Sequence, residues 1–407
     1  MYIKQKIIFI IGFLLILSVL VFNQFTLEYI FSHDGAIDSN DKLFIIWIYD
    51  FLALIIGIVI FYNRGETKII LRTIFIIFIQ IIVVFLMLEG SLRLYFAILH
   101  HFSPAEMTFE KQIGWQNSPN LSRNNYRQLY GNINYSTQKY GFRIFGNTNT
   151  HKTKILIIGD SFTMADNISD GNSYYDYLLK NNSNIEIFVY GGGGYGSLQE
   201  YMILDKYIDE INPNIILWQF CDNDFINNDH ELESRSMLHG GLDPRPYYIN
   251  DEIIVTVPWQ RHGKLYNFFH KLYFIKLTLL EIRILEKDHL ITIEKELTQD
   301  HSLYLNSYQT TENIMKLVIN RIGEIPLISF NAKIYDDFPN WWSKAFNKIA
   351  NDNNFIFLTQ ITDSLTSARD SGINIDYYPE DAHWNQTGHS IVGNVLLEYL
   401  VNNNFID

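Results

Sequence analysis

The sequence predicts an α/β protein whose parallel sheet carries helices on both faces, preceded by three transmembrane helices. Two observations predict this class. Long apolar runs fill the first hundred of the 407 residues, and short apolar runs alternate with helical periodicity beyond residue 153. Such alternation is typical of a parallel sheet covered by helices. We therefore expect a membrane region at 1–98, a lead-in segment at 99–150 that wraps the domain, and an α/β domain at 151–407 with an insertion at 231–325.

Charge is distributed unevenly along the chain. Only 18% of the residues are charged, against about 25% in ordinary globular proteins. Residues 1–98 hold seven basic and seven acidic side chains, so the remainder carries the whole net charge of −13. An acidic remainder argues against a nucleic-acid partner, because phosphate binding needs a basic face. The single cysteine, Cys221, excludes an intramolecular disulfide.

Three apolar runs predict the transmembrane helices, at about 7–22, 43–62 and 73–95. Each is near the length that a helix needs to cross roughly 30 Å of hydrocarbon at about 1.5 Å per residue. Two lysines precede the first run, and a lysine and two arginines separate the second run from the third, so the positive-inside rule predicts a cytoplasmic N-terminus. Three spans then place the remaining chain outside the cytoplasm, beside membrane lipids. Buried helices of a globular core are the alternative interpretation. Asp50, within the second run, is interpreted as a polar contact between helices rather than as part of a membrane pathway.

Five short apolar runs predict the strands of the sheet. Each is rich in Ile, Val and Phe and is bounded by Asn, Asp or Gly. They cover 154–158, 185–190, 215–220, 326–330 and 355–358. Helical periodicity indicates helices over 173–179, 198–211 and 385–401. Within the insertion, Asn250-Asp251-Glu252 predicts a hairpin. Residues 264–287 predict an amphipathic helix, for which packing on the sheet domain is favoured over a position above the active-site cleft or against the bilayer.

Polar or glycine-rich motifs follow the first three strands. In this architecture ligands bind at the carboxyl ends of the strands. Ser161, on the turn after the first strand, would project its hydroxyl at that edge. The glycine run 191–196 lets the backbone approach a substrate closely, and Asn223 could direct its side-chain amide at a developing oxyanion. Turns and helix caps are the competing interpretation of each motif.

The last motif precedes the closing helix and contains His383, with Asp381 two residues earlier. His383 could accept the serine proton while Asp381 orients the imidazole. We expect Asn385 to cap the closing helix and His389 to be a structural residue within it. His383 and His389 are not expected to form a metal site, because a spacing of six does not place two ligands on one helical face.

Taken in order, four motifs resemble the blocks of the SGNH/GDSL hydrolase superfamily. The resemblance covers about residues 105–407 and implies a flavodoxin-like domain of three layers. It departs from the family pattern at Cys221, where the family has glycine, and in the two-residue spacing between acid and histidine. That spacing is nearer to the alginate O-acetyltransferase group. The four motifs are Gly159-Asp160-Ser161, the glycine run 191–196, Cys221-Asp222-Asn223-Asp224 and Asp381-Ala382-His383.

The resemblance also implies a role for each site residue. Ser161 would be the nucleophile, His383 the base and Asp381 the acid that orients the base. The oxyanion would be bound by the Ser161 amide, the Gly194 amide and the Asn223 side chain. Two alternatives stay open at this point: Glu380 in place of Asp381, and Gly191 in place of Gly194.

The function implied by the resemblance is that of a membrane-anchored, serine-dependent esterase. It would act through an acyl-serine on O-acyl groups, above all O-acetyl groups, of an extracytoplasmic glycan or lipid, with neither metal nor cofactor. The alternatives are an O-acyltransferase of envelope polysaccharide and a catalytically inactive scaffold of an envelope complex. Protein partners are not identified. Aromatic side chains could stack on sugars, although burial in the core is the other interpretation; these are Trp259, Trp341, Trp342 and Trp384.

Overall fold

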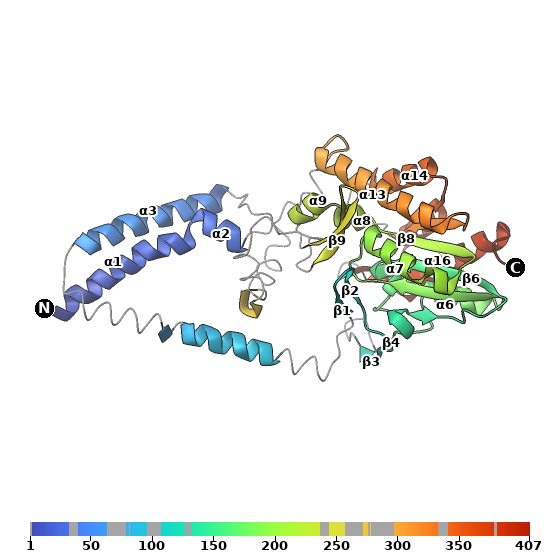
Figure 1. The fold of residues 1–407 in the computed structure, drawn as a ribbon, viewed down its shortest axis with the longest axis horizontal. Coiled ribbons are helices and arrows are strands. Elements are labelled where there is room, and N and C mark those ends of the chain that lie inside the picture. The colour runs from blue at the N-terminus through green and yellow to red at the C-terminus, as the bar shows by residue number, and fades with distance from the viewer. Residues whose placement is uncertain are drawn as a thin grey trace. The chain divides into compact units, whose positions relative to one another are not determined.

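The chain divides into two compact units (Figure 1). The first comprises Met1–Pro104 and Trp259–Leu290, and the second comprises Ala105–Pro258 and Ile291–Asp407. The structure, a computed structural model, describes residues 2–31, 40–62, 79–80, 82–95, 107–126, 132–236, 244–256, 272–275, 277, 297–332, 341–377 and 381–407.

The N-terminal unit contains helices α1 (Tyr2–Phe22), α2 (Gln24–Phe31) and α3 (Asn40–Tyr62), and a helical segment at 82–95. Helices α1 and α3 pack along each other and bury Ile10 and Ala53. A glycine at position 57 allows this approach, because a Cβ there would lie only 2.9 Å from the carbonyl oxygen of Gly12.

The prediction of three transmembrane helices at 7–22, 43–62 and 73–95 is wrong. Within the described part of the chain, no helix combines the length and the apolar character that a membrane crossing requires. The multi-pass localisation, the extracytoplasmic placement and the contact with membrane lipids all depended on those spans, so they lose their support as well. The physical reason is that an apolar run shows only that a helix has apolar surface to bury. Helices α1 and α3 bury part of that surface against each other.

A buried carboxylate joins two segments within the N-terminal unit. Glu89 is 6% exposed and accepts hydrogen bonds from the backbone N–H groups of Tyr273 and Phe274 at 3.1 and 3.2 Å. It also pairs with Arg93 at 2.7 Å. Of the helix predicted at 264–287, all but residues 272–275 and 277 lies outside the described residues. The described ones belong to the N-terminal unit.

The second unit is built on a six-stranded sheet with the order β12-β11-β8-β6-β7-β5. The five strands predicted from the sequence are present and parallel, which confirms the α/β class. Strand β6 lies between β7 and β8, so the strand order reverses at β6: the chain adds β7 on one side of it and β8 on the other. In open α/β sheets, ligands bind at the carboxyl ends of the strands where the order reverses. The parallel strands are β6 (Thr153–Gly159), β7 (Ile185–Gly191), β8 (Ile215–Phe220), β11 (Leu327–Asn331) and β12 (Ile356–Leu358), with β5 (Ile144–Phe145) antiparallel at the edge.

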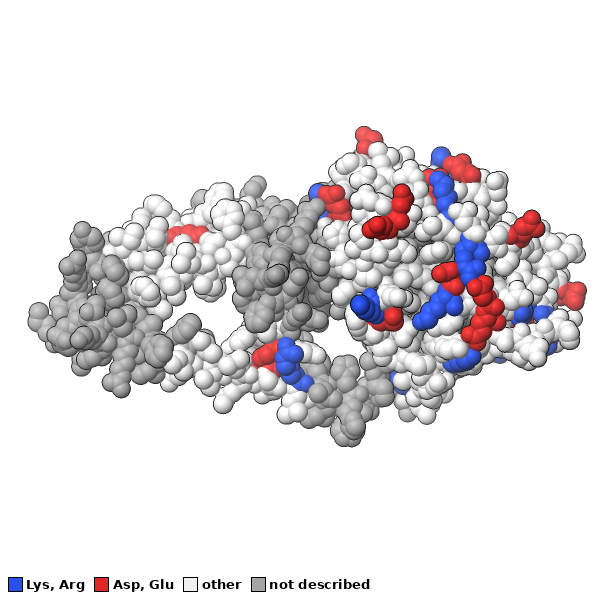
Figure 2. Space-filling view, viewed as in Figure 1, with Lys and Arg blue, Asp and Glu red and all other residues white. Residues whose placement is uncertain are grey.

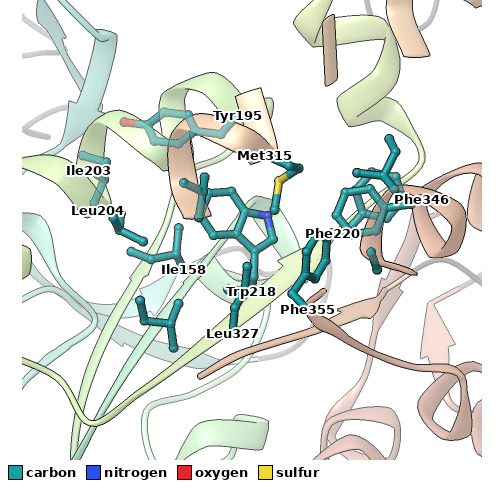
Figure 3. Packing of buried hydrophobic residues seen from close by; sticks show 14 of the residues in the cluster. Ile158, Tyr195, Ile203, Leu204, Trp218, Phe220, Met315, Leu327, Phe346 and Phe355 are labelled. Atoms are coloured by element: carbon teal, nitrogen blue, oxygen red, sulfur yellow. The ribbon is translucent and has the colours of Figure 1, made fainter. Parts of the chain in front are cut away.

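Helices cover both faces of this sheet and create two separate cores. Side chains alternate along each strand, so Leu156 and Ile158 enter one core whereas Ile155 and Ile157 enter the other. Trp218 lies at the centre of the first core, near Ile158 and Met315 (Figure 3). The first core is covered by α7 (Ser197–Ile211), α13 (Ser302–Ile322) and α14 (Trp341–Asp352), and the second by α6 (Tyr174–Asn181), α15 (Thr359–Asp370) and α16 (Gln386–Asn402).

Helix α13 was not predicted, although it forms part of the first core. Polar residues on its buried side obscured its apolar periodicity. Ser307 and Thr311 are fully buried, the first donating to the carbonyl oxygen of Phe225 and the second accepting from Asn228 at 3.0 Å. These hydrogen bonds compensate for burying the two hydroxyls.

The predicted hairpin in the insertion is confirmed. Strands β9 (Arg245–Ile249) and β10 (Glu252–Thr256) pair antiparallel. Asn250 and Asp251 connect them with φ values of 52° and 64°, the left-handed pair that a two-residue hairpin turn requires.

Further short strands pair with one another outside the main sheet. In the lead-in, β1 (Met107–Glu110) pairs with β2 (Gly114–Asn117), and β3 (Ser122–Tyr126) pairs with β4 (Ile133–Ser136). Near the C-terminus, β13 (Asp376–Tyr377) pairs with β14 (Asp381–Trp384). Acidic and basic side chains are interspersed over the visible face of this unit (Figure 2). Among its ion pairs, Arg321 pairs with both Asp205 and Asp209.

Candidate active site

Ser161 is the first residue of α5 (Ser161–Met164), a single helical turn that begins where β6 ends. The side chain of Asp160 caps this turn by accepting a hydrogen bond from the Phe162 N–H at 2.9 Å. The turn ends at once because Ala165 adopts a left-handed φ of 48°. Such a junction of strand and turn presents the serine hydroxyl at the carboxyl edge of the sheet.

Gln219, on the neighbouring strand β8, holds the Ser161 turn in place. Its side-chain oxygen accepts hydrogen bonds from the Asp160 N–H at 3.1 Å, the Thr163 N–H at 3.1 Å and the Thr163 hydroxyl at 2.8 Å. The Met164 N–H donates to the Asp160 carbonyl oxygen at 2.9 Å. The Ser161 N–H, in contrast, makes no hydrogen bond within the described chain, so it is available to a ligand. Sequence reasoning missed Gln219, since a single glutamine in an apolar strand matches no motif.

The structure brings Ser161, His383 and Asp381 together. The Nε2 atom of His383 lies 2.7 Å from the Ser161 hydroxyl, and its Nδ1 atom lies 2.5 Å from Oδ1 of Asp381. The same carboxylate oxygen accepts the backbone N–H of His383 at 3.2 Å, which fixes the carboxylate relative to the ring. The alternative acid, Glu380, lies outside the described residues.

The surroundings of His383 favour its protonated form. Burial lowers the pKa of His383, but the hydrogen bond and the charge of Asp381 raise it, and the charges of Asp160 and Asp166 add to this effect. The net result is a pKa of His383 above the ordinary value of 6.5. A base of this kind retains a proton that it has accepted more firmly than free imidazole does.

Residues after His383 anchor its strand. The indole N–H of Trp384 donates to the Ala332 carbonyl oxygen at 3.1 Å, and Trp384 is buried. Asn385 caps α16, as predicted, by accepting the N–H groups of Thr387 and Gly388 at 2.8 and 3.2 Å.

His389 is buried within α16, in agreement with the structural role predicted for it. Its Nδ1 atom accepts the Tyr174 N–H at 3.3 Å, and its ring stacks on that of Tyr174. Burial, together with the charges of Arg143 and His383, lowers the pKa of His389 to about 3.

The glycine run lies beside the Ser161 turn, because the Gly192 N–H donates to the Gly159 carbonyl oxygen at 3.0 Å. Gly194 is exposed, has a φ of +68°, and its N–H makes no hydrogen bond among the described residues. Gly191 is buried, and a Cβ there would lie 2.0 Å from the Met164 nitrogen. This geometry favours Gly194 over Gly191 as the donor to a ligand.

Asn223 begins α8 (Asn223–Asn228) directly after β8. One of its two side-chain N–H groups donates to Asn227 at 3.1 Å, which leaves the second for another acceptor. The carboxylate of the next residue, Asp224, is fully buried and accepts a hydrogen bond from the Ser197 hydroxyl at 3.3 Å. Cys221, where the SGNH/GDSL pattern has glycine, is buried and forms no disulfide.

The tryptophans considered for sugar stacking are not available for it where the structure describes them. Trp342 is 0% exposed and Trp384 is 1% exposed, so both belong to the core. Trp259 and the side chain of Trp341 lie outside the described residues.

No protein-family model and no curated protein matches the sequence. Solved structures resemble the α/β unit at low identity. A lipolytic protein of the G-D-S-L family from Veillonella parvula shares 12% identity at a TM-score of 0.37 and covers 61% of this chain and 98% of its own. An acetylxylan esterase from Geobacillus stearothermophilus shares 11% identity at a TM-score of 0.33, covering 60% of this chain and 93% of its own. A lipase/acylhydrolase from Enterococcus faecalis shares 13% identity at a TM-score of 0.34, covering 62% and 96%. At these scores the matches carry no weight for the function of this chain.

Proposed function

We propose that this protein is a serine-dependent ester hydrolase of the SGNH/GDSL type. The observation that carries the proposal is the continuous hydrogen-bonded series from the Ser161 hydroxyl through the His383 imidazole to the Asp381 carboxylate. A serine hydroxyl is a weak nucleophile unless a neighbouring base takes its proton. His383 is that base, and Asp381 holds its ring in the tautomer that accepts at Nε2.

Acylation of Ser161 is the first chemical step. The Ser161 oxygen forms a bond to the ester carbonyl carbon as its proton passes to Nε2 of His383. The carbonyl oxygen becomes an oxyanion, and the protonated imidazole is stabilised by Asp381. When the intermediate collapses, the bond to the alcohol oxygen breaks, His383 returns its proton to that oxygen, and the acyl group stays on Ser161.

Three donors are assigned to the oxyanion: the Ser161 N–H, the Gly194 N–H and the second side-chain N–H of Asn223. The assignment is supported by the absence of other partners for the two backbone groups among the described residues. It is also supported by the position of all three residues at the carboxyl ends of adjacent strands β6, β7 and β8. Removing one donor of this kind typically costs about 10² to 10³ in rate.

Hydrolysis of the acyl-enzyme completes the cycle. Water gives a proton to His383 and adds to the acyl carbon, and the Ser161 oxygen then leaves and regains its proton. The products are a free carboxylic acid and the regenerated serine. We propose an O-acetyl glycan as the substrate class, which rests on the motif resemblance alone.

The experiment uses the full chain and Ser161→Ala. We expect the wild-type protein to hydrolyse p-nitrophenyl acetate and to be labelled by a fluorophosphonate, with the mass increase on the peptide that contains Ser161. Ser161→Ala should lose labelling and at least about 10³-fold in turnover. Ser371→Ala is the matched control, because the Ser371 hydroxyl is exposed and donates only within its own helix end.

Absence of both turnover and labelling in folded wild-type protein would overturn the proposal. Activity retained by Ser161→Ala would overturn it as well. Release of acetate from acetylated oligosaccharides, measured with the same variants, tests the substrate class separately from the reaction.

A further inference from the structure

Two consecutive carbonyl groups of the glycine run accept hydrogen bonds from side chains outside the run. The indole N–H of Trp115 donates to the Gly193 carbonyl oxygen at 2.9 Å. The guanidinium of Arg245 donates to the Gly194 carbonyl oxygen at 2.7 Å. Neither residue belongs to a strand of the main sheet, since Trp115 lies on β2 and Arg245 on β9.

These carbonyls belong to a tight turn. The Tyr195 N–H donates to the Gly192 carbonyl oxygen at 3.1 Å, so Gly193 and Gly194 are its two central residues. The φ of +68° at Gly194 is typical of the third residue of a type II turn. The central peptide of a type II turn is rotated by about 180° relative to that of the commoner type I turn. In a trans peptide the carbonyl oxygen and the N–H point in opposite directions. The orientation of the Gly193 carbonyl therefore sets the direction of the Gly194 N–H.

Two side chains of strand β2, Trp115 and Asn117, donate hydrogen bonds to the glycine run. Side chains two residues apart on a strand share a face, and Asn117 donates to the Gly191 carbonyl oxygen at 2.8 Å. In return, the Tyr195 hydroxyl donates to the Trp115 carbonyl oxygen at 2.6 Å. Strand β2, which carries Trp115, is therefore itself hydrogen-bonded to the glycine run.

Arg245 is fixed just as firmly. It is 3% exposed, its Nε lies 3.4 Å from the fully buried Glu233, and its guanidinium carbon lies 4.9 Å from the centre of the Trp115 ring. Tyr247 also donates to Glu233, at 2.8 Å. A planar guanidinium stacked on an indole and paired with a carboxylate has little freedom to move.

We infer that Trp115 and Arg245 are positioning residues that keep the Gly194 N–H turned toward the oxyanion of the reaction, an inference that rests on the proposed function. Rotation of the central peptide would direct the carbonyl oxygen of Gly193 at the oxyanion in place of the N–H. Trp115 opposes that rotation because its hydrogen bond exists in only one of the two orientations. Arg245 donates to the carbonyl oxygen of the following peptide, that of Gly194, and its guanidinium stacks on the Trp115 indole, which donates to the Gly193 carbonyl oxygen.

The experiment measures kcat and KM for p-nitrophenyl acetate and the urea midpoint of unfolding. Trp115→Phe keeps an aromatic ring but removes the indole N–H. We expect kcat to fall about 10- to 100-fold with KM within about twofold, because the loss of a well-oriented donor acts on the transition state. The second variant is Arg245→Lys, which keeps a positive charge opposite Glu233 but loses the planar guanidinium with its several N–H donors. It should lower kcat in the same way.

Trp218→Phe is the matched control. Trp218 is fully buried in the first core, and its indole N–H makes no hydrogen bond within the described chain. This change should lower the urea midpoint and leave kcat near the wild-type value. If the wild type is active but Trp115→Phe and Arg245→Lys keep its kcat, the inference is wrong. It is equally wrong if they lose kcat only in proportion to unfolded protein, as the urea midpoint reports. Wild-type protein without activity or labelling would instead overturn the proposed function.

Discussion

Nε2 of His383 and Oγ of Ser161 lie 2.7 Å apart, although 222 positions separate the two residues in the chain. The end of β6 positions the serine, and the β13–β14 hairpin positions the histidine. The hairpin is tied to the sheet by Trp384, and the serine turn is tied to it by Gln219. Both partners of the central hydrogen bond are thus attached to the same rigid sheet, which keeps their distance short.

Asp381→Asn should lower kcat about 10³- to 10⁴-fold with little change in KM. The amide would disfavour the His383 tautomer that accepts a proton at Nε2. The measurement is steady-state turnover of p-nitrophenyl acetate. Glu380→Gln is the comparison variant, and we expect it to retain most of the activity. A large loss in Glu380→Gln with none in Asp381→Asn would transfer the role of the acid to Glu380.

The pH profile should show an acidic limb above pH 6.5. His383 acts as a base only when neutral, and its pKa is raised by Asp381 against the opposing effect of burial. Activity is therefore expected to rise as pH increases through that pKa. Because the folded-state pKa is the higher one, the protonated ring stabilises the fold below pH 6.5, and this contribution is lost as pH rises through the folded value. In Asp381→Asn the residual activity should show the limb at lower pH; an unchanged limb would contradict the assignment.

Gln219→Leu should destabilise the protein and slow the reaction. The change leaves the buried N–H groups of Asp160 and Thr163 without an acceptor, at about 1 to 3 kcal/mol each. We expect a loss of about 2 to 6 kcal/mol in the free energy of unfolding, measured in urea, and about a tenfold lower kcat from displacement of Ser161.

Ser329→Ala is the control for Gln219→Leu. Ser329 is fully buried on the neighbouring strand β11, and its hydroxyl makes no hydrogen bond among the described residues. Its removal should leave stability and kcat almost unchanged. If both variants lose stability and kcat to the same extent, the hydrogen bonds of Gln219 make no specific contribution.

Asn385→Ala should lower the free energy of unfolding by about 1 kcal/mol, the usual contribution of a helix cap. Asn385→Asp keeps the oxygen that accepts from Thr387 and Gly388 but loses the donor to the carbonyl oxygens of Asn374 and Asp376. Urea unfolding of the two variants therefore separates the cap from the tie to β13. No loss in Asn385→Ala would rule out a stabilising cap.

Local pattern was sufficient to predict most of the sheet. The runs at 154–158 and 215–220 lie within strands β6 and β8, because a fully buried parallel strand is apolar without interruption. The same reasoning failed for α13, whose buried Ser307 and Thr311 interrupt the apolar stripe. It failed again for the apolar runs near the N-terminus, since hydropathy does not state whether lipid or another helix covers the surface.

The candidate site divides in the same way. Ser161, His383, Asp381, Gly194 and Asn223 were selected from the sequence because each lies in a short motif whose chemistry depends on neighbouring residues. No sequence pattern pointed to a role for Gln219, Trp115 or Arg245 at the site. Their importance lies in bonds to residues 51 to 78 positions away.

Propensity and periodicity act within a few residues, so the amino-acid pattern was enough to predict the α/β class, the strands and the residues available for the chemistry. The packing of distant segments brings those residues together, exposes Gly194, and supplies the side chains that bond to the Ser161 turn and to the glycine run. The reason is physical: the distances of 2.7 Å from Nε2 of His383 to the Ser161 hydroxyl and from Arg245 to the Gly194 carbonyl oxygen arise only when distant segments pack on one sheet.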